Sequence, residues 1–450
     1  MGARRREWRL KVPRGPRPGD ALAAALFPSL PTEVQWGLER TRRLLSTLGD
    51  PLSRTAILHV GGTNGKGSVA RIWASVLQAA GFRVGLYTSP ELIAFRERIL
   101  VNGRPLPDDF LLELAQELRE PVIREQPSWF EACTVLGFLA LERAGVDVAV
   151  MEVGMGGRLD STNVVKPAVT AITNVSLDHQ EVLGPTVRDI AREKAGILKA
   201  GVPAYTGVQD PDVLEVLALE AGTVGAPLIR VPEPAGTVAL DGIRTRLQTR
   251  RWGTVELHCP LVGRHQLANL AVAVRALEAL PPRFLASTAQ LQEGVARVRA
   301  PGRFQVERTP EGTWILDVAH NPASAAALGA TLTEVDPPGP VIGVVGIRAD
   351  KDHAGIVGAV AGALDGLVLT RPGPGSPEGA WAADRVGSLS ETGVEIRVEP
   401  SFAQALAEAR RWAGSQGTVV VSGSFATVAG ALETLDLVPR EALPPSSGSG

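Results

Sequence analysis

Short apolar runs alternate with amphipathic segments along the first half of the chain. Residues 55–60 (TAILHV) form a β-rich run that ends at two glycines, and residues 67–81 have helical spacing that stops at Gly81. The same alternation predicts further strands at 83–88, 146–153 and 168–175 and helices at 130–145 and 186–198. It is typical of a mostly parallel sheet with helices on both faces, and residues 241–263 predict an antiparallel hairpin beside it.

A second series of alternating elements begins after a Pro-Gly pair within residues 296–304, which predicts a linker. The strands expected beyond it lie at 313–319, 340–347, 366–370, 394–398 and 418–423. We therefore predict the fold class α/β, with a P-loop-type mostly parallel sheet domain and a smaller Rossmann-like α/β C-terminal domain. The predicted boundaries are 1–20 for a flexible basic arm, 21–298 for the first and larger α/β domain, 303–440 for the C-terminal domain and 441–450 for a disordered tail.

The composition fits a cytoplasmic protein of two domains. The chain has 450 residues, 44% of them hydrophobic and 21% charged. A formal net charge of -2 gives no electrostatic reason to expect nucleic acid or a membrane as partner, and no apolar run is long enough to span a bilayer. The basic start lacks the apolar core of a signal peptide. Cys133 and Cys259 are the two cysteines, and their apolar surroundings predict reduced core residues.

Lysine is scarce in this chain, which draws attention to the few lysines present. Only six of the 46 basic residues are lysines, so arginine is the default positive charge. Lysine is a compact point charge that can lose its proton and react, and arginine cannot do so. Surface roles suffice for Lys11, Lys166 and Lys199, whereas Lys66 and Lys194 lie in more specific segments.

The segment HVGGTNGKGSVA, residues 59–70, joins a strand to a helix through a glycine-rich turn. Such a turn directs several backbone N–H groups and a helix N-terminus at one point, which suits phosphate. It departs from the usual G-x-x-x-x-G-K-[ST] pattern, because Val60 stands at the first glycine position and Gly67 at the hydroxyl position. The alternative is an ordinary glycine-rich turn of a βα unit. We predict a nucleotide-phosphate site formed by Gly62, Thr63, Asn64, Gly65, Lys66, Gly67 and Ser68.

A carboxylate and a set of motifs extend this interpretation. Glu152 ends an apolar strand near the loop, where carboxylates commonly hold Mg²⁺; the alternative is a solvated glutamate. The sequence GTNGKGS resembles the folylpolyglutamate synthase and bifunctional dihydrofolate synthase family of the Mur ligase superfamily. The resemblance covers nearly the whole chain, through segments that follow in the family's order: YTSPELIAFRERI, FEACT, EVGMGGRLDSTN, SLDHQEVLGPTVRDIAREKAGI, GRHQLANLAVA, PGRFQ and DVAHNP.

The resemblance implies a metal-dependent catalytic centre. It implies Ser89 and Glu152 as ligands of a first Mg²⁺ and puts His179 near a second, with Asp178 able to orient the ring. It implies carbamylation of Lys194, which converts a cation into an oxygen ligand; the alternative is an ion pair with a neighbouring carboxylate on the helix. Lys66, Lys194 and His179 are the predicted catalytic residues.

The resemblance also implies contacts to ATP and to the folate. Asn269 is expected at the adenine, and Arg303 and Asp317 at the phosphate and ribose. Phe130 and Asp160 are expected to hold the pterin through an aromatic face and an N–H acceptor, although core packing is the alternative for Phe130. His320 is assigned to substrate binding, and helix capping near Pro322 is the alternative for both Asp317 and His320.

The expected activity is ATP- and Mg²⁺-dependent ligation of L-glutamate to a folate, or also to dihydropteroate, by a monomer. ATP would convert a carboxylate into an acyl phosphate, which the glutamate amine would attack. Two alternatives remain: a Mur-type ligase acting on UDP-N-acetylmuramoyl substrates, and a P-loop nucleotide-binding protein without ligase activity. One departure concerns specificity, because Glu91 replaces the histidine that usually follows Ser-Pro in the family.

Overall fold

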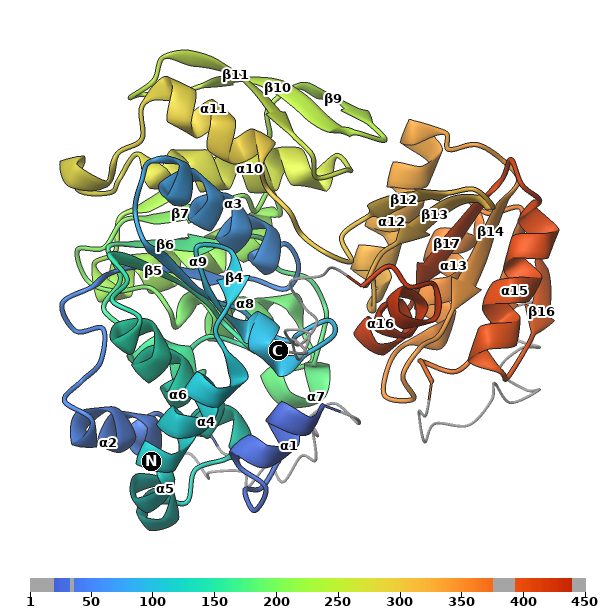
Figure 1. The fold of residues 1–450 in the computed structure, drawn as a ribbon. Helices are drawn as coiled ribbons and strands as arrows, with labels where there is room; N and C mark the ends of the chain where they lie inside the picture. Colours follow the sequence, from blue (N-terminus) through green and yellow to red (C-terminus); the bar gives the residue numbers. More distant parts are fainter. Residues whose placement is uncertain (1–19, 33–35, 375–392, 439–450) are drawn as a thin grey trace, which may run out of the picture. The chain divides into compact units, whose positions relative to one another are not determined.

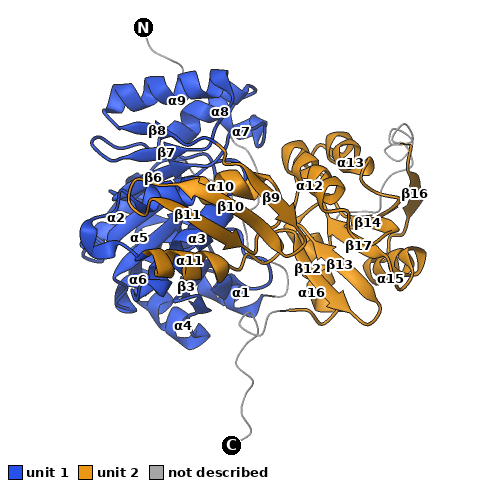
Figure 2. Ribbon diagram, turned by 90° about the horizontal axis from the view of Figure 1, so that it is seen from above, with its two compact units in different colours: residues 1–232, 272–287 blue, residues 233–271, 288–450 orange. Residues whose placement is uncertain are grey.

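The computed structural model describes residues 20–32, 36–374 and 393–438. The predicted tail, and the predicted basic arm apart from Asp20, lie outside the described residues. The chain divides into two compact units, coloured separately in Figure 2. Unit 1 comprises residues 1–232 and 272–287, and unit 2 comprises residues 233–271 and 288–450.

An eight-stranded sheet forms the centre of unit 1 (Figure 1). Its strand order is β4-β3-β2-β5-β1-β6-β7-β8; β2 and β5 to β8 run parallel with β1, and β3 and β4 form antiparallel pairs at one edge. The central strands are buried almost throughout, which explains their uninterrupted apolar runs. The bounds are β1 Ala56–Gly61, β2 Val84–Tyr87, β3 Ile99–Val101, β4 Arg104–Pro105, β5 Val148–Glu152, β6 Val169–Ile172, β7 Ala204–Thr206 and β8 Leu228–Arg230.

Helices connect these strands, and local sequence signals mark where several of them begin. Ser128 and Glu131 form a capping box at the start of α6, and Asp210 caps α9 ahead of Pro211. The bounds are α1 Ala21–Leu26, α2 Glu39–Thr47, α3 Lys66–Ala79, α4 Asp108–Glu117, α5 Arg119–Glu125, α6 Trp129–Arg143, α7 Gln180–Leu183, α8 Val187–Ala195 and α9 Pro211–Val224, with short 3₁₀ helices η1 Phe95–Arg98, η2 Ser161–Val164 and η3 Pro282–Phe284.

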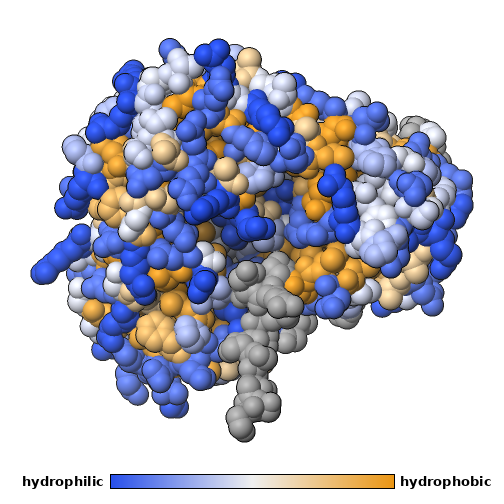
Figure 3. Space-filling view, turned by 45° about the horizontal axis from the view of Figure 1, so that its top comes forward, coloured by the Kyte–Doolittle hydropathy of each residue, from blue (hydrophilic) through white to orange (hydrophobic). Residues whose placement is uncertain are grey.

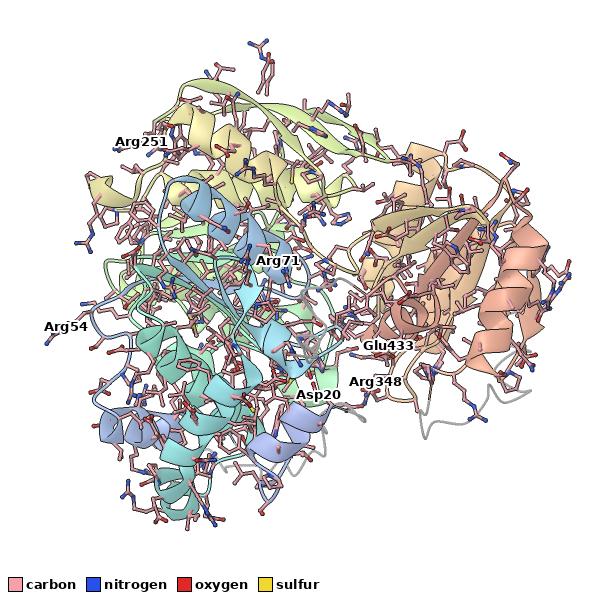
Figure 4. The ribbon with its side chains drawn as sticks, in the orientation of Figure 1. Asp20, Arg54, Arg71, Arg251, Arg348 and Glu433 are labelled. Atoms are coloured by element: carbon pink, nitrogen blue, oxygen red, sulfur yellow. The ribbon has the colours of Figure 1, made fainter. Side chains whose placement is uncertain are left out.

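Asp20, labelled in Figure 4, ties the first helix to a distant turn of unit 1. Its Oδ1 accepts a hydrogen bond from the backbone N of Ala23 at 3.0 Å, which caps α1. Its Oδ2 accepts from the backbone N of Phe95 at 2.5 Å. One carboxylate therefore fixes both the start of α1 and the start of η1.

Unit 2 begins with a three-stranded antiparallel sheet of order β11-β10-β9. Buried and exposed residues alternate along β10 and β11, as expected for strands with one covered face. The predicted hairpin over 241–263 is confirmed, and β9 adds a third strand. The bounds are β9 Gly236–Ala239, β10 Gly242–Gln248 and β11 Thr254–Cys259. The helix α10 His265–Leu277 begins in unit 2 and ends in unit 1, and α11 Thr288–Ala296 belongs to unit 2.

A six-stranded sheet completes unit 2, in the order β12-β13-β17-β14-β15-β16. All its neighbouring strands are parallel except β12, which pairs antiparallel with β13. Leu367 packs in the core beneath α12 and α13, whereas Gly366 faces Trp412 of α15, so helices cover both faces. The bounds are β12 Gln305–Thr309, β13 Gly312–Leu316, β14 Val341–Val345, β15 Gly366–Leu369, β16 Glu395–Val398 and β17 Thr418–Ser422, with α12 Pro322–Val335, α13 His353–Ala361, α15 Phe402–Ala413 and α16 Phe425–Thr434.

The two compact units do not follow the order of the chain, and the domain boundary expected at 298–303 stays a prediction. Val238 of β9, Leu240 directly after it and Val262 after β11 pack into the same apolar core as Phe304, just before β12, and Ile315 of β13. The three-stranded sheet therefore groups with the C-terminal elements, because side-chain packing and not position along the chain defines a compact unit.

Surface hydrophobicity is scattered on the face drawn in Figure 3, where hydrophilic and hydrophobic residues are interspersed. Within the described ranges, no helix combines the length and the apolar character needed to cross a membrane. Two exposed large apolar side chains, Leu159 and Leu177, stand directly before the predicted site residues Asp160 and Asp178.

Candidate active site

The predicted phosphate loop lies between the end of β1 at Gly61 and the start of α3 at Lys66. Gly65 precedes the helix with a φ of 82°, and Gly62 has a φ of 143°. A Cβ on Gly62 would lie 1.9 Å from Thr173 Oγ1, so no larger residue fits there without movement. The loop therefore depends on glycine at the two points where the backbone turns sharply.

Residues that follow β6 hold this loop in place. The backbone N of Thr63 donates to the carbonyl oxygen of Asn174 at 2.9 Å, and the backbone N of Asn64 donates to Asn174 Oδ1 at 2.8 Å. Thr173 Oγ1 donates to the carbonyl oxygen of Asn64 at 2.6 Å. Sequence reasoning missed Thr173 and Asn174, whose only signal was two polar residues at the end of an apolar strand.

Two lysines meet at the carbonyl oxygen of Gly62. Lys66 Nζ donates to it at 3.2 Å and to the Thr63 carbonyl at 3.0 Å, and Lys194 Nζ donates to the Gly62 oxygen at 2.9 Å. Lys194 is only 3% exposed. Burial, followed by the charge of Lys66, lowers the pKa of Lys194 to about 7, while Asp178 and Asp160 oppose the shift. An amine with this pKa is partly unprotonated near neutrality, the form that reacts with electrophiles.

The predicted metal ligands lie at the carboxyl ends of neighbouring strands. Glu152 ends β5 and pairs in register with Val60 of β1, and Ser89 follows β2, the strand on the other side of β5. Both residues are at least nine-tenths buried. No group of three His, Cys, Asp or Glu side chains suited to a metal exists among the described residues. One carboxylate and one hydroxyl nevertheless fit Mg²⁺, which keeps several waters and phosphate oxygens as its other ligands.

His179 and Asp178 form the turn before α7. His179 adopts a left-handed backbone with a φ of 50°, and its N donates to Asp178 Oδ1 at 2.9 Å. Its ring Nε2 lies 3.9 Å from the same oxygen, which is longer than a hydrogen bond. The structure thus puts Asp178 beside the ring and within electrostatic reach of Lys194.

Asp160 holds its own loop together. Its Oδ2 accepts from the backbone N of Met155 at 2.9 Å, and its Oδ1 accepts from Thr162 N at 3.0 Å and Thr162 Oγ1 at 2.6 Å. Phe130, the other predicted pterin contact, is half-buried at the start of α6, whereas its neighbour Trp129 is buried. Phe130 is thus not a fully enclosed core residue.

Gly154, Gly156 and Gly157 follow the end of β5. At Gly157 another segment of the protein lies close: a Cβ there would lie 2.7 Å from the Glu193 carbonyl oxygen and 2.9 Å from that of Lys194. A Cβ on Gly196 would likewise lie 2.4 Å from Arg158 Cα. This reciprocal contact seats the end of α8 against the loop after β5 and so positions Lys194.

Glu91 forms a buried ion pair with Arg98, and each side chain is 6% exposed. The Arg98 guanidinium lies 5.2 Å from the centre of the Trp129 ring and 5.6 Å from that of Phe95. Burial is the largest single influence and would lower the pKa of Arg98, but Glu91, Tyr87 and Cys133 together outweigh it and the net shift is upward. Sequence reasoning noticed Glu91 and missed its partner.

In unit 2, Asn269 is buried and donates through Nδ2 to Gln266 Oε1 at 2.9 Å. The Arg303 guanidinium lies 5.2 Å from the centre of the Phe425 ring. The Asp317 carboxylate accepts from Phe304 N and Ala319 N, each at 2.8 Å. Burial raises the pKa of Asp317, and the charge of Arg303 opposes the shift.

Neither the Asp317 nor the His320 side chain caps α12, which was the alternative role for these two residues. Asn321 caps α12, with its Oδ1 accepting from Ser324 N at 2.9 Å. His320 Nδ1 instead lies 2.9 Å from the Val318 carbonyl oxygen, and its ring is 5.7 Å from that of Phe425. Arg303 and His320 therefore pack on the same aromatic ring.

Comparison with known families matches two domains to this chain. The Mur ligase middle domain matches residues 60–277, and the Mur ligase glutamate ligase domain matches residues 302–425. The first match contains the phosphate loop, both lysines and Glu152, and the second contains Arg303 and Asp317.

Similar proteins and structures agree with these matches. A Lacticaseibacillus casei folylpolyglutamate synthase is 34% identical over 88% of this chain and 94% of its own length. An Escherichia coli dihydrofolate synthase/folylpolyglutamate synthase is 34% identical over 90% and 92%. A structure of Mycobacterium tuberculosis folylpolyglutamate synthase with ADP has a TM-score of 0.81 at 33% identity, over 88% of this chain and 94% of that one. An E. coli structure with DHPP and ADP also has a TM-score of 0.81, at 34% identity over 94% and 99%.

Proposed function

This chain belongs to the folylpolyglutamate synthase and dihydrofolate synthase family of Mur ligases, and we propose that it uses ATP to join L-glutamate to a folate. The relatives described above are folate enzymes, which favours this substrate over a UDP-N-acetylmuramoyl one. The observation that carries the proposal within the site is the meeting of Lys66 and Lys194 at the Gly62 carbonyl.

The reaction we propose has two steps. A carboxylate oxygen of the folate attacks the γ-phosphorus of ATP, so ADP leaves and an acyl phosphate forms. The glutamate amine then attacks the acyl carbonyl, phosphate departs, and the nitrogen loses a proton to leave an amide. The first step brings two anions together, and Lys66 with the backbone N–H groups at the start of α3 offsets that repulsion.

Mg²⁺ fits this proposal as a bound cofactor, and it would neutralise phosphate charge during transfer. Glu152 and Ser89 are the residues that would hold the first ion, and we assign His179 to the surroundings of a second. For Lys194 we propose carbamylation: the unprotonated amine adds to CO₂, a proton is released, and the carbamate oxygens become available to a cation. Burial supports this proposal because it keeps an appreciable fraction of the amine unprotonated.

The folate acceptor is assigned to Asp160 and to the half-buried ring of Phe130. The exposed side chains of Leu159 and Leu177 supply apolar surface beside Asp160 and Asp178. Asn269, Arg303, Asp317 and His320 stay predictions for nucleotide and substrate contacts. We further propose a cytoplasmic monomer that needs neither nucleic acid nor a membrane, which fits the net charge of -2.

The decisive experiment measures phosphate release from Mg-ATP and L-glutamate, with mass spectrometry of the products. One arm receives 7,8-dihydropteroate and the other receives tetrahydrofolate. A gain of one glutamate in both arms means a bifunctional enzyme, and a gain only with tetrahydrofolate means a polyglutamate synthase. No gain in either arm, although ATP binds, contradicts the proposed function.

A further inference from the structure

His59 is a buried titratable residue that the proposed reaction does not use. It lies on β1, shortly before the phosphate loop, and is 0% exposed. Burial, followed by the charge of Lys199, lowers the pKa of His59 to about 3, so the ring is neutral at physiological pH. A neutral imidazole carries one N–H donor, and its partner fixes which nitrogen holds the hydrogen.

The hydrogen bonds around His59 run in one direction. His59 Nε2 lies 3.0 Å from Thr162 Oγ1, and Thr162 Oγ1 lies 2.6 Å from Asp160 Oδ1. An ionised carboxylate only accepts, so the Thr162 hydroxyl donates to Asp160 and its oxygen accepts from His59. His59 is therefore the Nε2–H tautomer, and the order of donation is His59 to Thr162 to Asp160.

The other ring nitrogen, Nδ1, shows that the polar contact of His59 is the one made through Nε2. Nδ1 is buried and has no hydrogen-bond partner among the residues that the structure describes. An imidazole buried only for packing would be replaced at lower cost by an apolar side chain, because an unsatisfied buried acceptor is unfavourable. The cost of leaving Nδ1 without a hydrogen bond is offset if the Nε2–H group is needed to orient the Thr162 hydroxyl.

We propose that His59 is a positioning residue that, through Thr162, fixes the Asp160 carboxylate for binding the folate acceptor. The inference rests on the proposed function, because Asp160 is assigned there to the pterin. With the hydroxyl of Thr162 and the backbone N of Met155 both held, the two oxygens of Asp160 present their remaining lone pairs in a fixed direction. Preorganisation of this kind affects affinity for the group that Asp160 touches and leaves ATP binding unchanged.

The chain supplies a matched control on the same surface of the sheet. Thr170 of β6 pairs in register with His59, and its Oγ1 is also buried without a partner in the described part of the chain. Thr170→Val removes a buried hydroxyl next to His59 without breaking the chain of bonds to Asp160. Thr162→Val breaks the same chain of hydrogen bonds without a substitution in β1. It therefore tests the proposal even if His59→Leu disturbs the packing around the phosphate loop.

The test is a double-mutant cycle on steady-state kinetics with whichever of tetrahydrofolate and 7,8-dihydropteroate the wild type ligates. We expect His59→Leu and Thr162→Val each to raise the KM for the folate about tenfold, with the KM for Mg-ATP within about twofold of wild type. The double variant should be no more than about twofold worse than either single one, because both break the same chain. His59→Gln, which retains an N–H donor, should recover part of the loss, and Thr170→Val should change nothing.

Three results overturn the inference while the proposed function stands: an unchanged folate KM in Thr162→Val, additive effects in the double variant, or equal increases in the KM for folate and Mg-ATP. If His59→Leu fails to fold, Thr162→Val and His59→Gln decide between the outcomes. A wild type that adds no glutamate to either folate overturns the proposed function, and this inference with it.

Discussion

Two turns of unit 1 are held by different means. Glycines at its bends and hydrogen bonds with Thr173 and Asn174 fix the backbone of the phosphate loop, and Lys66 and Lys194 add hydrogen bonds to its Gly62 carbonyl. Charged groups hold the turn at 88–98: the Glu97 carboxylate accepts from the backbone N of Leu92, Ile93 and Ala94, and Glu91 pairs with Arg98. The first turn is therefore sensitive to shape, and the second is sensitive to which ionisable residues it contains.

The largest expected effect comes from breaking the charged turn. Arg98→Met leaves Glu91 buried without its cation, and we expect a loss of about 3–5 kcal/mol in the free energy of unfolding, measured with urea. Arg143→Met is the matched control, because its pair with Glu117 is exposed and worth about 1 kcal/mol or less. The double variant Arg98→Met with Glu91→Leu should recover most of the loss. If Arg98→Met and Arg143→Met lost the same free energy of unfolding, burial would not determine the strength of these ion pairs.

The next effect concerns catalysis at the phosphate loop. Lys66→Met retains the length of the side chain without its charge, so we expect kcat to fall about 10²–10³-fold with little change in thermal stability. Lys166→Met removes an exposed lysine and should leave kcat unchanged. Phosphate release at saturating ATP is the measurement, and a Lys66→Met enzyme with wild-type kcat would refute the role of this lysine.

A smaller effect on stability distinguishes a steric clash at Gly62 from the backbone strain that a substitution causes at any glycine with a positive φ. Gly62 and Gly81 both have a positive φ, of 143° and 94°, but a Cβ on Gly81 meets nothing within 4 Å. We expect Gly81→Ala to cost about 1 kcal/mol and Gly62→Ala to cost about 1–3 kcal/mol more, because its Cβ meets Thr173. Unfolding midpoints compare the two, and ATP affinity should fall only in Gly62→Ala. Similar costs would mean that Thr173 moves aside freely.

The most gradual effect is on pH dependence. Burial lowers the pKa of Lys194 to about 7 in the folded protein, whereas its ordinary value, which applies to the unfolded chain, is 10.5. Between these values the unfolded chain binds the proton that the folded protein lacks, so stability rises with pH. Relative to Lys194→Met, the wild type with its amine not carbamylated should gain up to about 1.4 kcal/mol per pH unit from pH 7 to 10.5. A difference between the two proteins that is flat over this window would contradict the burial of the ammonium group.

Local patterns were enough to predict most elements and to place the predicted phosphate loop between a strand and a helix, where the structure has it. The central strands are uninterrupted apolar runs because both faces of a parallel sheet are covered, and the loop carries its glycines, asparagine and lysine within a few residues. The scarcity of lysine also singled out Lys66 and Lys194, which the structure brings to one carbonyl oxygen.

Contacts between distant segments were outside the reach of that reasoning. The support that Asn174 gives the phosphate loop and the link from His59 to Thr162 join residues from different strands and turns, so no local period reports them. The sequence by itself determined which chemical groups are available and on which elements they stand. Only the tertiary structure decided which of those groups meet and how far burial shifts their pKa values, because strand order and packing set both.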